Sequence, residues 1–265
     1  MTSQLDVPLD DFLNDLGRAE RLLRLISEFR TFGASAASHV GEGNQSDPHW
    51  DEAKKLGETA QVVRQDLPVL AGALHLYICG RFEYFVRELV VSVSDLLSGT
   101  AERYMDLPKK LRDELFALTL TVAQNPSRYG YRPEETESFL IALAAGLSDG
   151  QGSVEIKSEV LAITEANMNP RVLADVLKRV GINSIWSDLG KQARFKTHLG
   201  VRSDGDCTKE AEGRLAKIMR DRNSFAHPTS STEFPDVDQV LDSCSFFRVL
   251  SEVIVDIAKL PPGKD

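Results

Sequence analysis

The residues with the clearest chemical potential lie close together near the end of the chain. Arg220, Arg222, Asn223 and His227 occur within one short segment, directly before Pro228. An imidazole titrates near neutral pH, so it can accept or donate a proton during a reaction. A guanidinium presents a rigid set of N–H donors that suits a phosphate. Together these residue types suit acid–base chemistry at a phosphate group.

The segment before these residues is predicted to be the helix that positions them. Residues 208–219 are rich in good helix formers, and Pro228 removes a backbone donor, which ends a helix. Since the residue before a proline disfavours the α conformation, we expect His227 on the last turn or just beyond it. An apolar stripe runs through Leu215, Ile218, Met219, Phe225 and Ala226. Arg222 lies on this stripe, where a charge is unfavourable unless it is paired or faces a cleft or a partner.

Apolar residues recur with helical spacing along most of the chain, and no convincing strand pattern is present. We expect helices over residues 8–32, 50–66, 68–97, 108–122, 133–147, 170–180, 184–198, 208–226 and 236–260. A small and polar loop is expected to begin at Gly33, and residues 154–163 fit either a helix or a strand. The aromatic residues Tyr77, Phe82, Tyr84 and Phe85 are interpreted as core. The fold class is therefore all-α, a helical bundle with a helical insertion.

We interpret residues 1–265 as a single domain with four parts. These parts are N-terminal helices (1–66), a first half of the bundle (68–122), an inserted helical region (123–205), and a motif helix with a C-terminal helix (206–260). The stretch 148–152, rich in glycine and polar residues, is the clearest linker-like break.

The composition is typical of a soluble globular protein, with 42% hydrophobic and 27% charged residues. No apolar run approaches the roughly 20 residues of a membrane span, and the N-terminus lacks the features of a signal peptide. Three widely spaced cysteines indicate neither a disulfide framework nor a zinc site. We therefore expect a cytoplasmic protein with no metal site and no cofactor.

The net charge of −9 argues against a protein that coats nucleic acid non-specifically, because neutralisation of phosphates supplies most of that affinity. A few arginines focused in one groove can still dominate the local field. An acidic chain is therefore compatible with a small basic cleft that acts on nucleic acid.

Arg222-Asn223 followed by Ala226-His227, at the end of an amphipathic helix and before a proline, resembles the signature of the HEPN superfamily. Two further patches resemble the RiboL-PSP-type HEPN branch. Residues 74–89, with an aromatic residue and Glu83, are similar to its early bundle helix, and residues 169–182 resemble its short insertion. The three patches span roughly residues 70–258, and the resemblance does not extend to the first 60 residues.

This resemblance implies a HEPN-like helical bundle and a metal-independent endoribonuclease that cuts single-stranded RNA by attack of the 2′-hydroxyl on the adjacent phosphate. Such proteins act in toxin–antitoxin and antiviral defence systems, and they typically form homodimers in which two motifs meet in one cleft. The motif arginine corresponds to Arg222, the motif histidine to His227, and the polar residue after the arginine to Asn223. An antitoxin or another regulatory partner protein is expected as a restraint.

The roles of Arg220 and Glu83, two residues that could support the motif, have two interpretations each. Arg220 is either a second phosphate contact or an exposed charge paired with Asp221. Glu83 is either a support that orients His227 or Arg222, or a structural partner in the bundle. Two non-catalytic readings also stay open. In one, Arg222 is a buried ion-pair partner of Glu83 or another acid. In the other, the chain is a HEPN-like module that binds a partner protein and uses the motif helix for dimerisation. A weaker third reading is a nucleotide-binding sensor in which the same arginines hold a phosphate.

Overall fold

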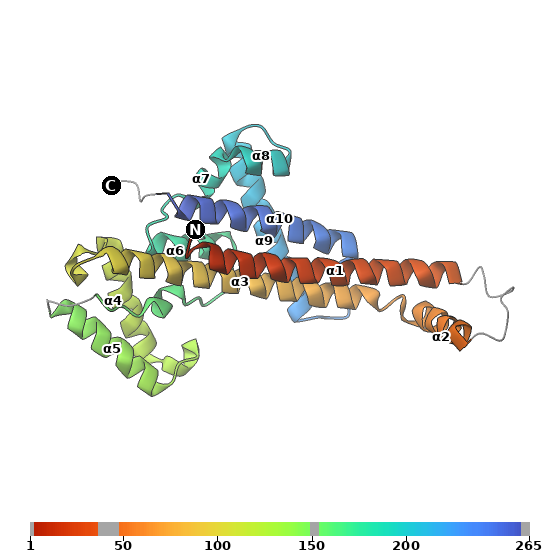
Figure 1. Cartoon of the computed structure of the whole chain (residues 1–265), viewed down its shortest axis with the longest axis horizontal. Helices are drawn as coiled ribbons and strands as arrows, with labels where there is room; N and C mark the ends of the chain where they lie inside the picture. The colour runs from red at the N-terminus through yellow and green to blue at the C-terminus, as the bar shows by residue number, and fades with distance from the viewer. Residues whose placement is uncertain (1–2, 37–47, 149–153, 261–265) are drawn as a thin grey trace. The chain divides into compact units, whose positions relative to one another are not determined.

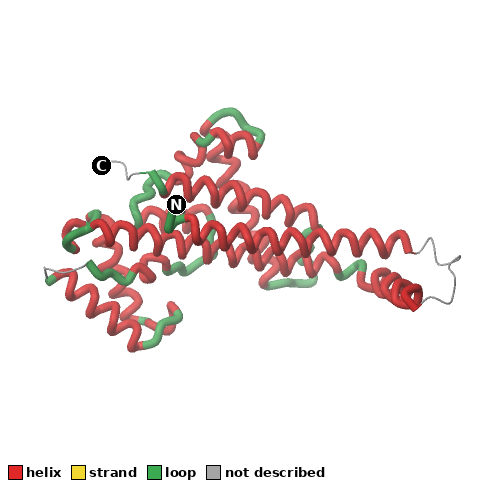
Figure 2. Tube along the Cα trace, viewed as in Figure 1, coloured by secondary structure: helices red, strands yellow, loops and turns green. Residues whose placement is uncertain are grey.

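The computed structural model describes residues 3–36, 48–148 and 154–260. This part of the chain contains helices and loops and no strand, so the predicted all-α class is confirmed (Figure 2). None of the described helices combines the length and the apolar character that crossing a membrane requires.

Ten α-helices follow one another along the described ranges of the chain (Figure 1). They are α1 (Asp6–Ala36), α2 (Pro48–Val63), α3 (Leu67–Thr100), α4 (Lys109–Gln124), α5 (Pro133–Leu147), α6 (Pro170–Arg179), α7 (Ile185–Lys191), α8 (Ala193–Leu199), α9 (Asp204–Ala226) and α10 (Val237–Ala258). Three short 3-10 helices, Tyr104–Asp106, Pro126–Tyr129 and Ser158–Ala162, lie in the connections. Most predicted helices are present with ends shifted by a few residues.

Three local expectations were wrong. The loop predicted to begin at Gly33 is helical up to Ala36, since alanines favour continuation of the helix. The helix predicted over residues 184–198 is broken at Gln192 into α7 and α8. Residues 154–163 form neither a strand nor a regular α-helix but an irregular segment with one 3-10 turn. Arg179 Nη1 holds this segment through the carbonyl oxygens of Leu161 (2.6 Å) and Ile163 (2.8 Å).

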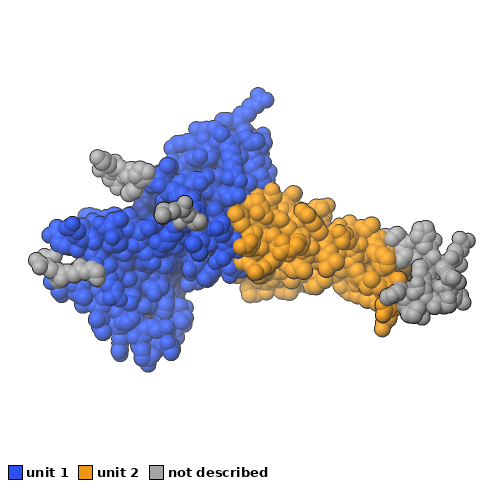
Figure 3. Space-filling model, viewed as in Figure 1, with its two compact units in different colours: residues 1–12, 81–219, 249–265 blue, residues 13–80, 220–248 orange. Residues whose placement is uncertain are grey.

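The chain divides into two compact units (Figure 3). Unit 1 comprises residues 1–12, 81–219 and 249–265, and unit 2 comprises residues 13–80 and 220–248. Helices α1, α3, α9 and α10 each contribute one end to each unit. The end of α9 that carries Arg220, Arg222 and Asn223 belongs to unit 2, and so does His227 directly after it.

Unit 1 has a core in which aromatic rings from α1 and α3 pack together. The rings of Phe12 and Phe85 stack with centroids 5.3 Å apart, and Phe82 lies 5.8 Å from Phe12. The prediction that Tyr77 and Tyr84 are also core residues was wrong. The side chains of Tyr77, in unit 2, and Tyr84, in unit 1, are 38% and 46% exposed.

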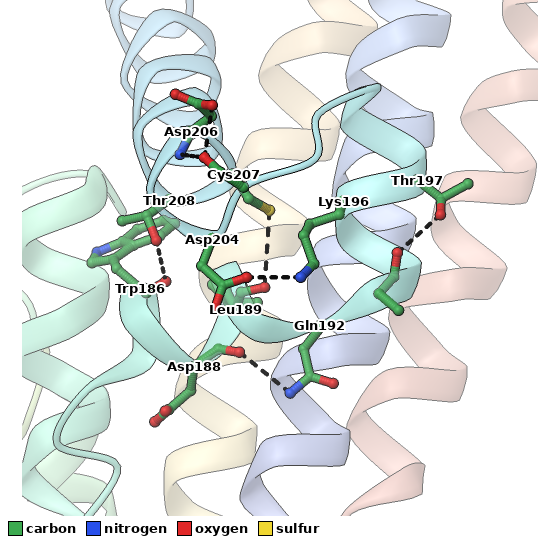
Figure 4. A network of polar contacts seen from close by, with 12 residues as sticks. Trp186, Asp188, Leu189, Gln192, Lys196, Thr197, Asp204, Asp206, Cys207 and Thr208 are labelled. Carbon is green, nitrogen blue, oxygen red and sulfur yellow. Dashed lines mark hydrogen bonds and ion pairs between the residues drawn. The ribbon is translucent and has the colours of Figure 1, made fainter.

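In the same unit, α7 and α8 pack against the start of α9, which anchors the helix of the motif at its N-terminal end (Figure 4). Thr208 Oγ1 donates to the carbonyl of Trp186 (3.0 Å), and Lys196 Nζ pairs with Asp204 (2.7 Å). Gly190 permits this close packing, since a Cβ atom there would lie 2.7 Å from the carbonyl oxygen of Asp204.

Unit 2 combines an apolar core with a few polar contacts inside it. Its fully buried large side chains include Leu16, Leu23, Ile78, Phe246 and Phe247. The buried carboxylate of Asp15 accepts a hydrogen bond from Tyr77 Oη (2.7 Å) and pairs with Arg18 (2.9 Å). These contacts offset the cost of burying a charge.

Candidate active site

The motif lies where α9 ends. Ala226 is the last helical residue, and His227 follows directly, with its backbone N–H donating to the carbonyl of Asn223 (3.2 Å). This is the position predicted from Pro228, which has no N–H with which to continue the helix. The imidazole is therefore carried on a fixed backbone at the first residue beyond a helix of 23 residues.

Exposure separates the motif helix into two faces. Leu215, Ile218, Met219 and Phe225 are buried, so the predicted apolar stripe is present. Arg222 is half-buried beside this stripe, whereas Arg220, Asn223 and His227 are exposed. The imidazole and the amide are therefore accessible to a substrate, and the guanidinium of Arg222 lies between the core and the solvent.

The guanidinium of Arg222 is directed towards the motif itself. Its Nη1 donates to the side-chain oxygen of Asn223 at 3.2 Å, so the two adjacent residues orient each other. No carboxylate among the described residues forms an ion pair with Arg222. Its remaining N–H groups are therefore available for an oxyanion.

Arg222 also lies within electrostatic range of Cys79 on α3. Burial strongly raises the pKa of the Cys79 thiol, and the positive charge of Arg222 acts in the opposite direction. Burial prevails, so Cys79 stays protonated at neutral pH and is no nucleophile. Of these two groups, the imidazole of His227 is therefore the candidate for proton transfer.

The segment after His227 is held by its own hydroxyl groups. The backbone N–H of Thr229 donates to Oγ1 of Thr232 (2.8 Å), and the N–H of Thr232 donates back to the carbonyl of Thr229 (3.0 Å). Ser231 adds a hydroxyl contact to Thr229 (3.0 Å). Such turns stabilise a chain reversal without regular secondary structure.

An aromatic anchor fixes the same segment to α3 and α9. The ring of Phe234 stacks on Phe225, with centroids 5.8 Å apart, and Phe225 meets the buried His75 edge-on at 5.2 Å. Gly72 makes room for Phe234, because a Cβ atom there would lie 2.5 Å from its Cδ1. The chain on both sides of His227 is therefore anchored to the core of unit 2.

The segment ends in a reciprocal helix cap. Oδ1 of Asp236 accepts from the backbone N–H of Gln239 (2.9 Å), and the side-chain oxygen of Gln239 accepts from the N–H of Asp236 (3.1 Å). This pair satisfies donors at the start of α10. The site-bearing connection between α9 and α10 is thus fixed at both ends.

The two supporting residues occupy different surroundings. Arg220 is exposed and forms no ion pair with a described acid, Asp221 included. Glu83 lies in unit 1, where its Oε1 accepts from Thr164 Oγ1 (3.2 Å). The contact of Glu83 is thus with the inserted region.

The arrangement can perform proton transfer and bind an oxyanion. His227 offers an accessible acid–base group, and Arg222 offers N–H donors five residues earlier on the same helix end. Within the described ranges, no group of three or more histidine, cysteine or acidic side chains is placed to hold a metal ion.

Sequence reasoning missed the anchor of this site. Gly72, His75 and Phe234 lie far from the motif in sequence or beyond its end, and only the fold brings them to Phe225. One signal was available, since a glycine inside an otherwise apolar helix often marks a close approach of another group.

Comparison with protein families identifies a matching family model. The family model described as RiboL-PSP-HEPN matches residues 51–260, a range that contains the motif and all helices from α3 to α10. No curated protein and no solved structure matches the chain significantly.

Proposed function

Because this chain belongs to the RiboL-PSP-HEPN family, we propose that it is a metal-independent endoribonuclease that cleaves single-stranded RNA. The observation that carries the proposal is an exposed His227 five residues after Arg222, whose guanidinium has no carboxylate partner among the described residues. A structural arginine would be expected to pair with an acid when half-buried.

The reaction is an internal transesterification. The 2′-hydroxyl oxygen of one ribose attacks the adjacent phosphorus, and the bond from phosphorus to the 5′-oxygen of the next nucleotide breaks. A base takes the 2′-hydroxyl proton, and an acid delivers a proton to the leaving 5′-oxygen. The products are a 2′,3′-cyclic phosphate and a 5′-hydroxyl, and no water is consumed in this step.

Each group of the motif has a role in this reaction. His227 serves as the base in one subunit and as the acid in the other, which requires a homodimer in which two motifs share a cleft. Arg222 donates to the phosphate oxygens as negative charge accumulates on them. Asn223, which accepts from Arg222, keeps that guanidinium oriented.

The biological setting that suits this activity is a defence or toxin–antitoxin system in the cytoplasm. An enzyme that cuts cellular RNA damages its own cell, so its activity requires restraint. An antitoxin or another regulatory protein that covers the motif would provide it.

The test is cleavage of end-labelled single-stranded RNA in the presence of EDTA, comparing the unmodified chain with His227→Ala and Arg222→Ala. Both substitutions should lower the rate by on the order of 100-fold or more, because each removes a group that acts in the transition state. The cut ends should carry a cyclic phosphate. Lys217→Ala is the matched control, since Lys217 is an exposed cation on the same helix.

The outcomes separate this function from the alternative. RNA cutting that survives His227→Ala, or that stops in EDTA, would contradict the proposal. A chain that cuts no RNA but loses its dimeric state with Arg222→Ala would instead indicate a non-catalytic HEPN-like dimerisation or protein-binding module.

A further inference from the structure

Helices α4 and α5 of unit 1 form a hairpin that the proposed reaction does not use. The two helices pack against each other and are joined by the short connection 125–132 (Figure 1). They run antiparallel, because Gly146 near the end of α5 lies against Tyr104 just before α4. A Cβ atom at Gly146 would be 2.7 Å from Cδ2 of that ring. Side chains from both helices can therefore share one side of the hairpin.

Five exposed apolar side chains lie on the same side of this hairpin. Leu115 and Thr119 of α4 and Phe139 and Leu143 of α5 face one small cavity between the helices. The residue that follows each of them is turned by about 100° around the helix axis. Since the helices are antiparallel, equal turns lead to the same side of the pair. Together with Leu147, one turn after Leu143, these residues form the hairpin face: Phe116, Leu120, Leu140, Ala144 and Leu147.

The hairpin face is apolar over most of its length. Its four large side chains are between 37% and 51% exposed. Residues 138–148 of α5 contain no charged side chain, and the opposite side of this helix is buried against α4 through Phe139 and Leu143. A helix that is apolar on both sides is normally covered on both. Clustered exposed apolar side chains of this kind mark an interaction surface.

The two ends of the hairpin face carry opposite charge. At the start of α4, Lys109 and Arg112 outnumber Asp113. Lys109 lies seven residues before Phe116, which places it on the same side of the helix. At the other end, the start of α5 presents Glu134 and Glu137, which are exposed and form no ion pair with a described residue. A face with this pattern is complementary to its own reversed copy.

The size of the face suits a reversible interface. Helix α4 has 16 residues, so the face is about 24 Å long, and two helices with their side chains are about 20 Å wide. Two such faces in contact bury on the order of 1,000 Å² in total, which is the lower end of the range for specific interfaces. Association through this face should therefore depend on protein concentration.

We infer that the hairpin face binds the hairpin face of a second copy of this chain, with the two hairpins antiparallel about a two-fold axis. The four helices then form a bundle that buries the apolar side chains of both copies. The start of α4 in each copy lies towards the start of α5 in the other, so the basic and acidic ends attract each other.

The inference does not depend on the proposed ribonuclease activity. The hairpin face belongs to unit 1, whereas the end of α9 with the motif belongs to unit 2. A homodimer formed through the motif would use a different surface. The two contacts together would give an assembly larger than a dimer.

Sedimentation equilibrium of the full chain over a range of concentrations tests the inference. Leu140→Glu places a charge within the face and should raise the dissociation constant of this contact by about 30-fold or more, because the charge would be buried without a partner. The mass at intermediate concentrations should fall by half. Leu96→Glu is the matched control, since Leu96 of α3 is in the same unit and 39% exposed, against 37% for Leu140, but lies outside the face.

A charge reversal tests the orientation of the two copies and leaves the apolar residues unchanged. Lys109→Glu and Glu137→Lys should each weaken the association by about threefold or more, because each contact occurs twice in a symmetric pair. The double variant Lys109→Glu/Glu137→Lys exchanges the two charges and should restore the affinity of the unmodified chain. Circular dichroism of each variant verifies that the helices are retained.

Several outcomes would overturn the inference. One is a mass that does not change with concentration, and another is equal weakening by Leu140→Glu and Leu96→Glu. A double charge reversal that associates as weakly as the single variants would refute the antiparallel pairing. Association that is lost in Arg222→Ala but kept in Leu140→Glu would place the contact at the motif, which also overturns the inference.

Discussion

The ring of Phe234 occupies the space that a side chain at Gly72 would require. A Cβ atom at Gly72 would lie 2.5 Å from Cδ1 of Phe234, closer than real carbon atoms approach. Because Phe234 also stacks on Phe225, this contact joins α3, the end of α9 and the segment that begins at His227. The missing side chain on α3 thus helps to place the candidate catalytic histidine.

Replacing Gly72 should therefore destabilise the protein. Gly72→Ala places a methyl group against the ring of Phe234, and overpacking of this kind costs about 1–3 kcal/mol. The gain in helix propensity, about 0.5–1 kcal/mol, offsets only part of that loss. Urea unfolding monitored by circular dichroism measures the difference.

Gly80→Ala is the matched control for this substitution. Gly80 lies on the same helix, and nothing lies within 4 Å of the position that its Cβ would take. This variant should be as stable as the unmodified chain or more stable by up to about 1 kcal/mol. If the two alanine variants had equal stability, the Phe234 contact would not be tight.

The cap of α10 predicts a second stability effect. Asp236→Ala removes the acceptor for the N–H of Gln239 and should lower the free energy of unfolding by about 1 kcal/mol. Asp242→Ala removes an exposed acid within the same helix and should change stability by less than about 0.5 kcal/mol. Thermal unfolding of both variants tests this, and equal melting temperatures would refute the role of the cap.

The buried carboxylate of Asp15 predicts that the hydroxyl group of Tyr77 contributes to the stability of the fold. Tyr77→Phe removes the 2.7 Å hydrogen bond to Asp15 and leaves that buried charge with fewer donors, which should cost about 1–3 kcal/mol. Tyr84→Phe is the control, because the exposed Tyr84 contacts Arg81 through its ring rather than its hydroxyl. Equal urea midpoints for the two variants would count against this assignment.

The buried thiol of Cys244 predicts a dependence of stability on pH. Burial raises the pKa of this thiol from its ordinary 9.0 to about 12. Above pH 9 the unfolded chain loses this proton while the folded chain retains it, so the free energy of unfolding falls as the pH rises towards 12. The expected loss for this one thiol is about 1.4 kcal/mol per pH unit within that window.

Other groups of the protein titrate in the same pH range, so the measurement compares the unmodified chain with a variant that lacks the thiol. Urea unfolding of the unmodified chain and of Cys244→Ala at about pH 8 and about pH 10 isolates the contribution of the thiol. The stability advantage of the unmodified chain should shrink by about 1.4 kcal/mol between these conditions. An advantage that stays constant with pH would show that Cys244 is not the titrating group.

Lysine substitutions at the two arginines of the motif should have different effects on RNA cleavage. Arg222→Lys keeps the charge but removes the planar fork and the contact to Asn223, so RNA cleavage should fall by about tenfold or more. Arg220→Lys should change the rate by less than about threefold, because an exposed phosphate contact depends mainly on charge. Cleavage rates measured in EDTA test this prediction. A larger loss of rate in Arg220→Lys than in Arg222→Lys would assign the main phosphate contact to Arg220 instead.

The sequence by itself determined the all-α class, most of the helix positions and the family of this protein. Helix positions follow from apolar periodicity and from residues such as Pro228, which act on their immediate neighbours. The signature from Arg222 to His227 is also local, and the RiboL-PSP-HEPN match over residues 51–260 agrees with the resemblance read from it. The placement of His227 just beyond the helix was predictable for the same reason.

Only the tertiary structure decided which distant residues meet. The contact of Glu83 with Thr164, the exposure of Tyr77 and Tyr84, and the break at Gln192 each depend on packing between segments far apart in the chain. Periodicity shows which face of a helix is buried but not which helix covers it, because many partners bury the same apolar area equally well.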